Sequence, residues 1–313
     1  MKSKPLLTFL LCCIVLVCIS ILLTSCQVKN GKGIETKKLK VVTSLFPLYD
    51  FAKNVGGQKV DVILLLPPGT EPHGFEPRPG DITKIHKADI FVYTGRHMEP
   101  WVEDILNGIN RKNLMVIDTS KDIQLAEGYM NHDSKHGFDP HIWLDLSNTQ
   151  KMVDTIRDGF ITKDPAHKDY YSQNAEGYKT RLHELDKRFK DSFVTCKKDV
   201  FIHGGHFAFG YFAKRYNLKY LSAYKGFSPD AEPTPRNLIE LSKKLKQNNV
   251  EYIYYEELIM PRVAETIARE TGAKLLMLHA AHNVTSDEMD KGVTFLSIME
   301  QNLRNLKIGL QCQ

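Results

Sequence analysis

Short apolar segments alternate with helix-length segments of mixed polarity along most of this chain. Eight of the short segments are rich in Val, Ile, Leu and Tyr and fall into two groups of four: Leu39–Thr43, Val60–Leu66, Ile90–Tyr93 and Leu114–Ile117, then Val200–His203, Lys219–Ser222, Tyr252–Tyr255 and Lys274–Leu278. Strands separated by helices are typical of βαβ units, whose strands run parallel. We therefore expect an α/β fold of two lobes, each with a mostly parallel four-stranded sheet flanked by helices.

A long amphipathic segment separates the two groups of strands. Asp164 and Pro165 supply an N-cap and a proline at the first helical position. The apolar residues that follow recur every three or four positions: Tyr171, Ala175, Tyr178, Leu182, Leu185, Phe189 and Phe193. This period places one apolar stripe on a single helix face, and about 30 helical residues would extend about 45 Å. We expect a rigid connecting helix over residues 164–196, between a first lobe (39–163) and a second lobe (197–313).

The first 25 residues have the pattern of a secretory signal. Lys2 and Lys4 precede a nearly unbroken apolar run, which ends in small residues leading to Cys26. The alternative is a transmembrane anchor, but a run of about 18 residues is marginal for a full span. We expect removal of residues 1–25, lipidation of Cys26 and a flexible polar tether over residues 26–38. The mature protein would then be secreted and lipid-anchored on the outer face of the cytoplasmic membrane.

Removal of that segment changes the composition of the chain. Only Cys196 and Cys312 of the six cysteines would remain free of the signal and the lipid, so a dense disulfide framework is excluded. A single disulfide between them is possible, although we expect Cys312 to lie in a frayed tail.

Without Lys2 and Lys4 the formal charge falls from +5 to +3, and no basic block of the kind that binds nucleic acid is present. About 275 residues remain, enough for two buried cores.

Four of the twelve histidines lie in stiff loops near the ends of predicted elements. His73 follows three prolines, His141 follows one proline, His206 follows a glycine turn, and His282 follows the last predicted strand. In open α/β sheets, loops at the carboxyl ends of the strands line the ligand crevice. Neutral imidazole is a good zinc ligand, and zinc favours four nitrogen or sulfur donors in a tetrahedral array. With two of the histidines in each lobe, the sequence predicts a zinc site between the lobes.

Neighbouring side chains compete for two of these places. His279 lies three residues before His282, and Glu256 follows another strand of the same lobe, so either could replace His282 as the fourth donor. His203 competes with His206 in the same way, although alternation along the strand favours His206. His203, His279 and Glu256 are otherwise expected to stand behind the ligands. A weaker contact from His132 and His136, in the polar loop before His141, is a further alternative to a simply solvated loop.

Three motifs around these histidines resemble the signature segments of a known family. They are Leu66–Pro77, Asp139–Asp145 and His206–Tyr211, and they resemble the metal-binding solute-binding lipoproteins of ABC importers (cluster A-I), specifically the zinc-uptake branch. The resemblance covers essentially the whole mature chain. It implies two α/β lobes bridged by the helix, with the metal held by His73, His141, His206 and a more variable fourth residue, here His282.

The donor types distinguish the branches of that family. Manganese-type members are expected to have carboxylates at the third and fourth positions, whereas an all-nitrogen shell suits the softer Zn²⁺. The loop over residues 131–138 is shorter than the acidic, histidine-rich insert of many zinc-uptake members. The resemblance therefore implies Zn²⁺ as the transported ligand, captured between the lobes and delivered to an ABC permease and its ATPase by a monomeric protein.

Two other functions compete with zinc delivery. One is a manganese- or iron-binding importer component with an adhesin role. The other is a zinc hydrolase, which would need an open coordination position and a general base. No His-Glu-x-x-His motif is present in the chain. We therefore expect a binding protein rather than an enzyme.

Overall fold

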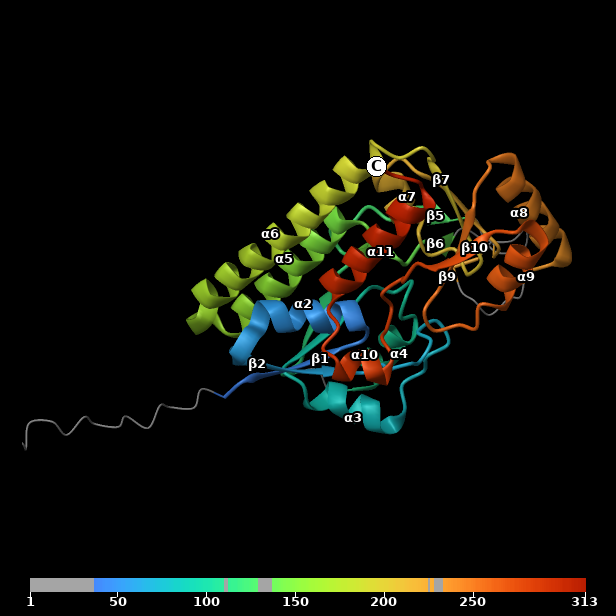
Figure 1. Ribbon diagram of the computed structural model, residues 1–313. Helices are drawn as coiled ribbons and strands as arrows, with labels where there is room; N and C mark the ends of the chain where they lie inside the picture. The colour runs from blue at the N-terminus through green and yellow to red at the C-terminus, as the bar shows by residue number, and fades with distance from the viewer. Residues whose placement is uncertain (1–36, 110–111, 129–136, 225, 228–232) are drawn as a thin grey trace, which may run out of the picture. The chain divides into compact units, whose positions relative to one another are not determined.

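Two four-stranded sheets, parallel throughout, form the framework of the computed structural model (Figure 1). The first contains β1 (Leu39–Thr43), β2 (Val60–Leu64), β3 (Ile90–Tyr93) and β4 (Met115–Asp118), in the order β2-β1-β3-β4; the second contains β7 (Val200–His203), β8 (Lys219–Ser222), β9 (Tyr252–Tyr255) and β10 (Lys274–Met277), in the order β10-β9-β7-β8. In each sheet the first strand in the chain lies between the second and the third. The two sheets therefore share one topology, and the predicted fold class is confirmed.

The structure describes residues 37–109, 112–128, 137–224, 226–227 and 233–313. The predicted signal, Cys26, most of the tether, His132 and His136 lie outside these residues. Helices of the described part are α2 (Phe46–Gly56), α3 (Pro79–Lys87), α4 (Trp101–Gly108), α7 (Gly210–Arg215), α8 (Pro235–Gln247), α9 (Arg262–Thr271), α10 (Ser286–Asp290) and α11 (Phe295–Gly309), besides the pair described below. Short 3₁₀ turns cover Gly57–Lys59, Ile142–Leu144 and Pro165–His167, and β5 (Glu127–Gly128) pairs antiparallel with β6 (Gly137–Phe138). Among the described helices, none has the length and apolar character that a bilayer span requires.

The long connecting helix is one of a pair. α6 (Lys168–Phe193) begins a few residues later than predicted because Pro165–His167 forms a 3₁₀ turn. Its predicted stripe is buried from Tyr171 to Phe189 and packs against α2, α5 and α11. The sequence pattern did not single out α5 (Leu146–Lys163), which lies beside α6 (Figure 1).

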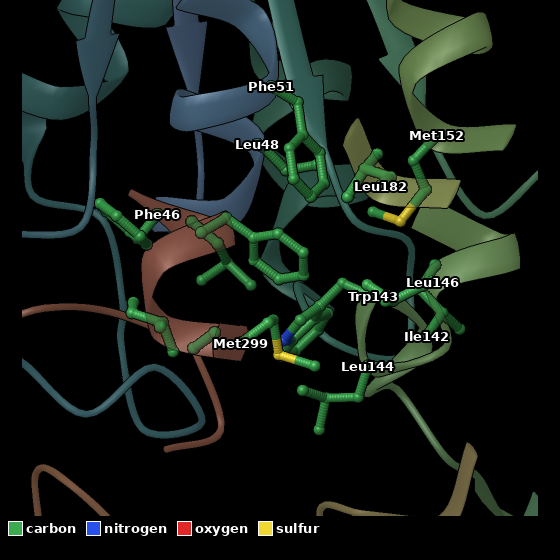
Figure 2. Packing of buried hydrophobic residues seen from close by; sticks show 14 of the residues in the cluster. Phe46, Leu48, Phe51, Ile142, Trp143, Leu144, Leu146, Met152, Leu182 and Met299 are labelled. Carbon is green, nitrogen blue, oxygen red and sulfur yellow. The ribbon is translucent and has the colours of Figure 1, made fainter. Parts of the chain in front are cut away.

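The hydrophobic core under these helices draws on distant parts of the chain (Figure 2). Phe46, Leu48 and Phe51 of α2 pack with side chains of α5, α6 and α11 and with the turn that contains Trp143: Ile142, Trp143, Leu144, Leu146, Met152, Leu182 and Met299. Residues 38–313 form one compact unit. The limits of the two lobes within it stay a prediction.

A buried carboxylate on α2 joins the same segments through hydrogen bonds. Asp50 accepts one from the Tyr178 hydroxyl of α6, at 2.8 Å, and one from the backbone N–H of Phe295, at 3.3 Å. Phe295 is the first residue of α11, where the backbone N–H groups have no partner within the helix. The C-terminal helix is therefore fixed to the first helix of the fold.

Cys196 and Cys312 form a disulfide that links the end of α6 to the end of the chain. The backbone N–H groups of Lys197 and Lys198 donate to the carbonyl oxygens of Gln311 and Leu310 beside it. The expectation of a frayed tail at Cys312 is therefore wrong. The end of the chain is held in place because α11 packs into the core up to Leu310, which is fully buried.

Candidate metal centre

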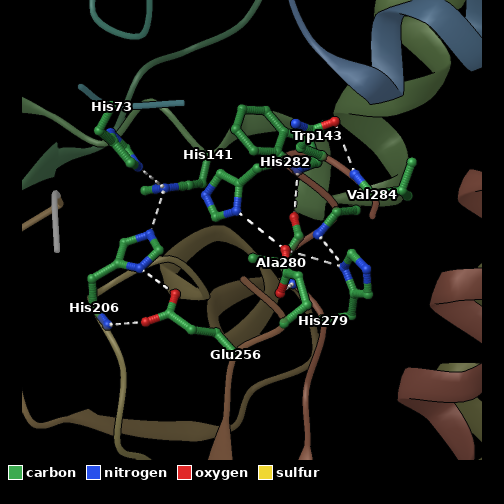
Figure 3. A network of polar contacts seen from close by, with 12 residues as sticks. His73, His141, Trp143, His206, Glu256, His279, Ala280, His282 and Val284 are labelled. Atoms are coloured by element: carbon green, nitrogen blue, oxygen red, sulfur yellow. Dashed lines mark hydrogen bonds and ion pairs between the residues drawn. The ribbon is translucent and has the colours of Figure 1, made fainter. Parts of the chain in front are cut away.

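Four of the predicted histidines converge on one point (Figure 3). His73, His141, His206 and His282 each offer a ring nitrogen, and these four atoms lie within 4.8 Å of one another. The Nε2 atom of His141 is 3.2 Å from the Nε2 atoms of both His73 and His206. In a tetrahedral zinc site with Zn–N bonds of about 2.0–2.1 Å, the nitrogens are about 3.3 Å apart. The spacing of these atoms therefore fits such an ion.

The imidazole of His141 is oriented by the residue two positions before it. Its Nδ1 lies 2.7 Å from Oδ1 of Asp139, which also accepts the backbone N–H of His141 at 2.9 Å. A proton on Nδ1 leaves the Nε2 lone pair directed at the cluster. Burial lowers the pKa of His141 well below its usual range and raises the pKa of Asp139 to about 8. Burial thus disfavours charge on both members of this hydrogen-bonded pair.

His73 is held differently from His141. It lies in the proline-rich loop after β2 and is half-buried. Burial lowers its pKa well below the usual range, and the neighbouring His206 and His282 lower it further. No carboxylate of the described residues forms an ion pair or hydrogen bond with its ring. His73 is therefore neutral, and the path of its loop determines its position.

The other two histidines end four-residue turns of the same spacing, which we call the first turn (His203–His206, beginning at the last residue of β7) and the second turn (His279–His282, after β10). In the first turn, His203 Nδ1 accepts the backbone N–H of Gly205 at 3.1 Å. In the second, His279 Nδ1 accepts the backbone N–H of Ala281 at 2.9 Å. The leading histidines thus close the turns and lie behind the cluster. The structure brings His206 and His282 into it instead.

Two consecutive glutamates after β9 stand behind the two turns, because β9 lies between β7 and β10 in the sheet. Glu256 is 2.5 Å from His206 Nδ1 through one oxygen and accepts the His206 backbone N–H through the other. Glu257 is 3.5 Å from His282 Nδ1 through one oxygen and accepts the Ala280 backbone N–H through the other.

Both glutamates remain charged. Burial tends to raise their pKa values, but His206 holds the pKa of Glu256 below its usual range. His279 and His282 hold the pKa of Glu257 well below its usual range in the same way. The two carboxylates therefore place negative charge behind His206 and His282, which favours a bound cation.

Trp143 closes the cluster on one side. Its ring centroid lies 5.4 Å from those of His141 and His282, and its Nε1–H donates to the carbonyl oxygen of Ala280 at 2.8 Å (Figure 3). Sequence reasoning assigned no role to Trp143 or Asp139. The Asp-Pro-His spacing was a usable signal for Asp139, since a carboxylate two residues away can reach an imidazole that a proline restrains.

The sequence comparisons identify a family over nearly the whole fold. Residues 41–309 match the family described as ZnuA, zinc-uptake complex component A periplasmic. The high-affinity zinc uptake system protein ZnuA of Bacillus subtilis (strain 168) is 37% identical over 302 residues, which is 93% of this chain and 94% of that protein. The zinc-binding lipoprotein AdcA of Streptococcus pneumoniae is 36% identical over 98% of this chain, but the chain spans only 61% of AdcA.

Solved structures agree with this relationship. The Zn(II)-bound ZnuA-like domain of AdcA from Streptococcus pneumoniae is similar with a TM-score of 0.75 at 36% identity, covering 87% of this chain and 99% of that domain. The laminin-binding protein Lmb of Streptococcus agalactiae, described as bifunctional with adhesin and metal transporting activity, gives a TM-score of 0.79 at 32% identity, covering 88% of this chain and all of Lmb. The chain belongs to the ZnuA family of zinc-uptake solute-binding proteins.

Proposed function

We propose that this protein captures Zn²⁺ outside the cytoplasmic membrane and delivers it to an ABC importer. One observation carries the proposal: four imidazole nitrogens lie within 4.8 Å of one another in a largely buried cluster. His282 Nε2 has no hydrogen-bond partner among the described residues, and a cation would satisfy it. An all-imidazole donor set favours Zn²⁺ over Mn²⁺, which prefers oxygen ligands.

The proposed ligands are His73, His141, His206 and His282. Four protein donors fill a tetrahedral shell, as in closed zinc sites, whereas catalytic zinc keeps a position open for water. A component of an uptake complex binds and releases its ion without transforming a substrate. The zinc hydrolase is therefore set aside.

The location and partners follow from the family and from the predicted N-terminal segment. Relatives of the chain are lipoproteins, which supports lipidation of Cys26 and attachment to the outer face of the membrane. A component of a zinc-uptake complex requires a permease and its ATPase as partners. An adhesin role like that stated for Lmb stays a prediction, as does the monomeric state.

Metal analysis of the purified protein tests the proposal. We expect one zinc per chain, tight binding of Zn²⁺ to the metal-free protein in competition with a chelator, and much weaker binding of Mn²⁺. His206→Ala and His282→Ala should abolish tight binding. His183→Ala, at an exposed position of α6, is the matched control. A preference for Mn²⁺, or equal zinc binding by all variants, would contradict the proposal.

A further inference from the structure

One buried side chain joins the loop of His73 to the second turn. We infer that Asn283 is a positioning residue for the metal centre, which holds the His73 loop against the segment of His282. The inference rests on the proposed zinc-binding function. It concerns how His73, whose ring is bonded to no carboxylate of the described residues, is held in position.

The side-chain amide of Asn283 is fully buried and fully hydrogen-bonded. Its Nδ2 donates to the carbonyl oxygen of Pro67 at 2.7 Å and to that of Thr70 at 3.0 Å. Its Oδ1 accepts the backbone N–H of Val284 at 2.9 Å. Two acceptors on one side and a donor on the other fix the orientation of the amide. No other uncharged side chain of similar size offers two donors and an acceptor in this arrangement.

Backbone contacts align the same two segments. The N–H of Gly69 donates to the Val284 carbonyl oxygen at 2.8 Å, and the N–H of Phe46 donates to the His282 carbonyl oxygen at 3.3 Å. Gly69 adopts a left-handed φ of +78°, which permits the sharp bend of the loop there. Residues 282–284 are therefore bonded to the start of α2 and to the loop after β2.

His73 depends on this attachment more than the other three histidines do. Asp139, Glu256 and Glu257 stand behind the rings of His141, His206 and His282. His73 has no such carboxylate in the described part of the chain. Beyond Thr70 its loop is bonded mainly to itself, as in the Gly74 N–H bond to Glu71. Carboxyl groups position the rings of the other three histidines directly. Asn283 positions His73 indirectly, by holding the backbone of its loop.

Loss of the Asn283 amide should release His73 first. The carbonyl oxygens of Pro67 and Thr70 would lose this donor, only the Thr70 N–H would remain on that of Pro67, and the loop would shift to hydrate them. The ion would then be held by three imidazoles and water. Because the partners that orient metal ligands typically contribute 10–100-fold in affinity, we expect Asn283→Ala to weaken zinc binding by about that factor and to speed zinc dissociation.

The test compares zinc affinity and the visible absorption of bound Co²⁺ in the wild-type chain, Asn283→Ala, His73→Ala and the double variant. Asn283→Ala should shift the Co²⁺ spectrum towards that of His73→Ala, because both leave the same position to water. In the His73→Ala background, Asn283→Ala should change the zinc affinity by less than about twofold. Asn174→Ala removes a similar amide bond, from Nδ2 to the Val55 carbonyl at 3.0 Å, and should leave affinity and spectrum unchanged.

The outcomes separate the inference from the function on which it rests. Failure of the wild-type chain to bind zinc would remove the proposed function. Tight wild-type binding with an unaffected Asn283→Ala, or with fully additive effects of the two substitutions, would overturn the role of Asn283 alone. If Asn283→Ala does not fold, as judged by circular dichroism, the isosteric Asn283→Asp replaces it and is expected to show the same coupling to His73.

Discussion

The first and second turns have the same spacing and share one hydrogen bond, from the N–H of the third residue to Nδ1 of the leading histidine, yet different residues lie between their histidines. In the first turn these are Gly204 and Gly205. A Cβ on Gly205 would lie 2.2 Å from Oε1 of Glu256, and one on Gly204 would lie 2.7 Å from the Cβ of Ala264. In the second turn Ala281 takes the third position with a left-handed φ of +57°. Gly205 does not adopt that region, so the same hydrogen bond forms on two different backbone conformations, and the neighbouring side chains decide which residues fit at each position.

The turns also differ in what holds them. The first is bonded within its own sheet region: the Gly204 N–H donates to the Tyr254 carbonyl oxygen at 2.7 Å, and the Ser222 hydroxyl donates to the Gly205 carbonyl oxygen at 2.6 Å. The second is bonded across the molecule, through Trp143 to Ala280 and through Asn283 to the His73 loop. Turns of the same length therefore bring two histidines into the cluster with different attachments to the rest of the molecule.

The largest expected effect is the loss of zinc affinity when a histidine of the cluster is replaced, compared with replacement of a histidine behind it. His206→Ala and His282→Ala should weaken zinc binding by more than about 100-fold, since loss of a ligand exceeds the loss of its supporting partner. His279→Ala should cost less than about 10-fold, because its Nδ1 is already engaged by Ala281. Competition with a chelator measures both. A larger loss for His279→Ala than for His282→Ala would transfer the fourth ligand to His279.

A reciprocal exchange at the third position of the turns should have unequal results. Gly205→Ala pushes the Glu256 carboxylate off His206, so we expect zinc affinity to fall by about 10–100-fold. Ala281→Gly relieves about 1 kcal/mol of left-handed strain, which the extra freedom of glycine in the unfolded chain offsets by about 0.4–1 kcal/mol. Its affinity and stability should therefore stay near those of the wild type, as checked by titration and thermal unfolding. Equal losses of zinc affinity in Gly205→Ala and Ala281→Gly would contradict the proposed difference between the two turns.

The pH dependence of zinc binding should report on the first turn. Burial alone would lower the pKa of His206, but Glu256 outweighs it and raises that pKa. Zinc needs the neutral imidazole, so affinity is highest at alkaline pH and declines as the pH falls through a value above about 6.5. His73 and His141, with lowered pKa values, compete for protons only at lower pH.

Glu256→Gln removes the largest of the causes that raise the pKa of His206. The onset of affinity loss should then move to lower pH, while affinity above neutrality falls by about 10-fold. Glu257→Gln, behind the second turn, is the matched comparison and should move the His206-dependent onset much less, because Glu257 contributes less than Glu256 to the raised pKa of His206. An onset that does not move in Glu256→Gln would contradict this assignment.

The smallest effect on the metal centre should come from the disulfide. Cys196→Ser with Cys312→Ser opens a bridge across a sequence separation of 116 residues, and we expect a loss of roughly 2–4 kcal/mol in unfolding free energy. Each kcal/mol corresponds to about 2–4 °C in Tm for a chain of this size. Zinc affinity should change by less than about twofold, because Asn302 of α11 holds His279 by two hydrogen bonds of its own. A clear loss of affinity would show that the second turn depends on the chain end.

Local pattern was enough to predict the strands, the stripe of α6 and the four histidines of the cluster. Strand periodicity and the stripe from Tyr171 to Phe189 arise within single elements, and the prolines and glycines beside His73, His141 and His206 mark stiff loops in the sequence itself. The sequence analysis did not pick out α5, although Met152, Ile156 and Phe160 recur at helical spacing; its buried face also contains the polar Asn148 and Thr149.

Only the tertiary structure decided between neighbouring histidines and supplied their partners. The two pairs of histidines, His203 with His206 and His279 with His282, have the same spacing. Alternation along the strand favoured His206, whereas His279 and Glu256 stayed alternatives to His282 until the structure placed His282 in the cluster. That choice depends on the order β10-β9-β7, which sets Glu256 and Glu257 behind the turns, and on contacts such as that of Asn283 with Pro67. These pairings join residues far apart in the chain, so no local periodicity carries them.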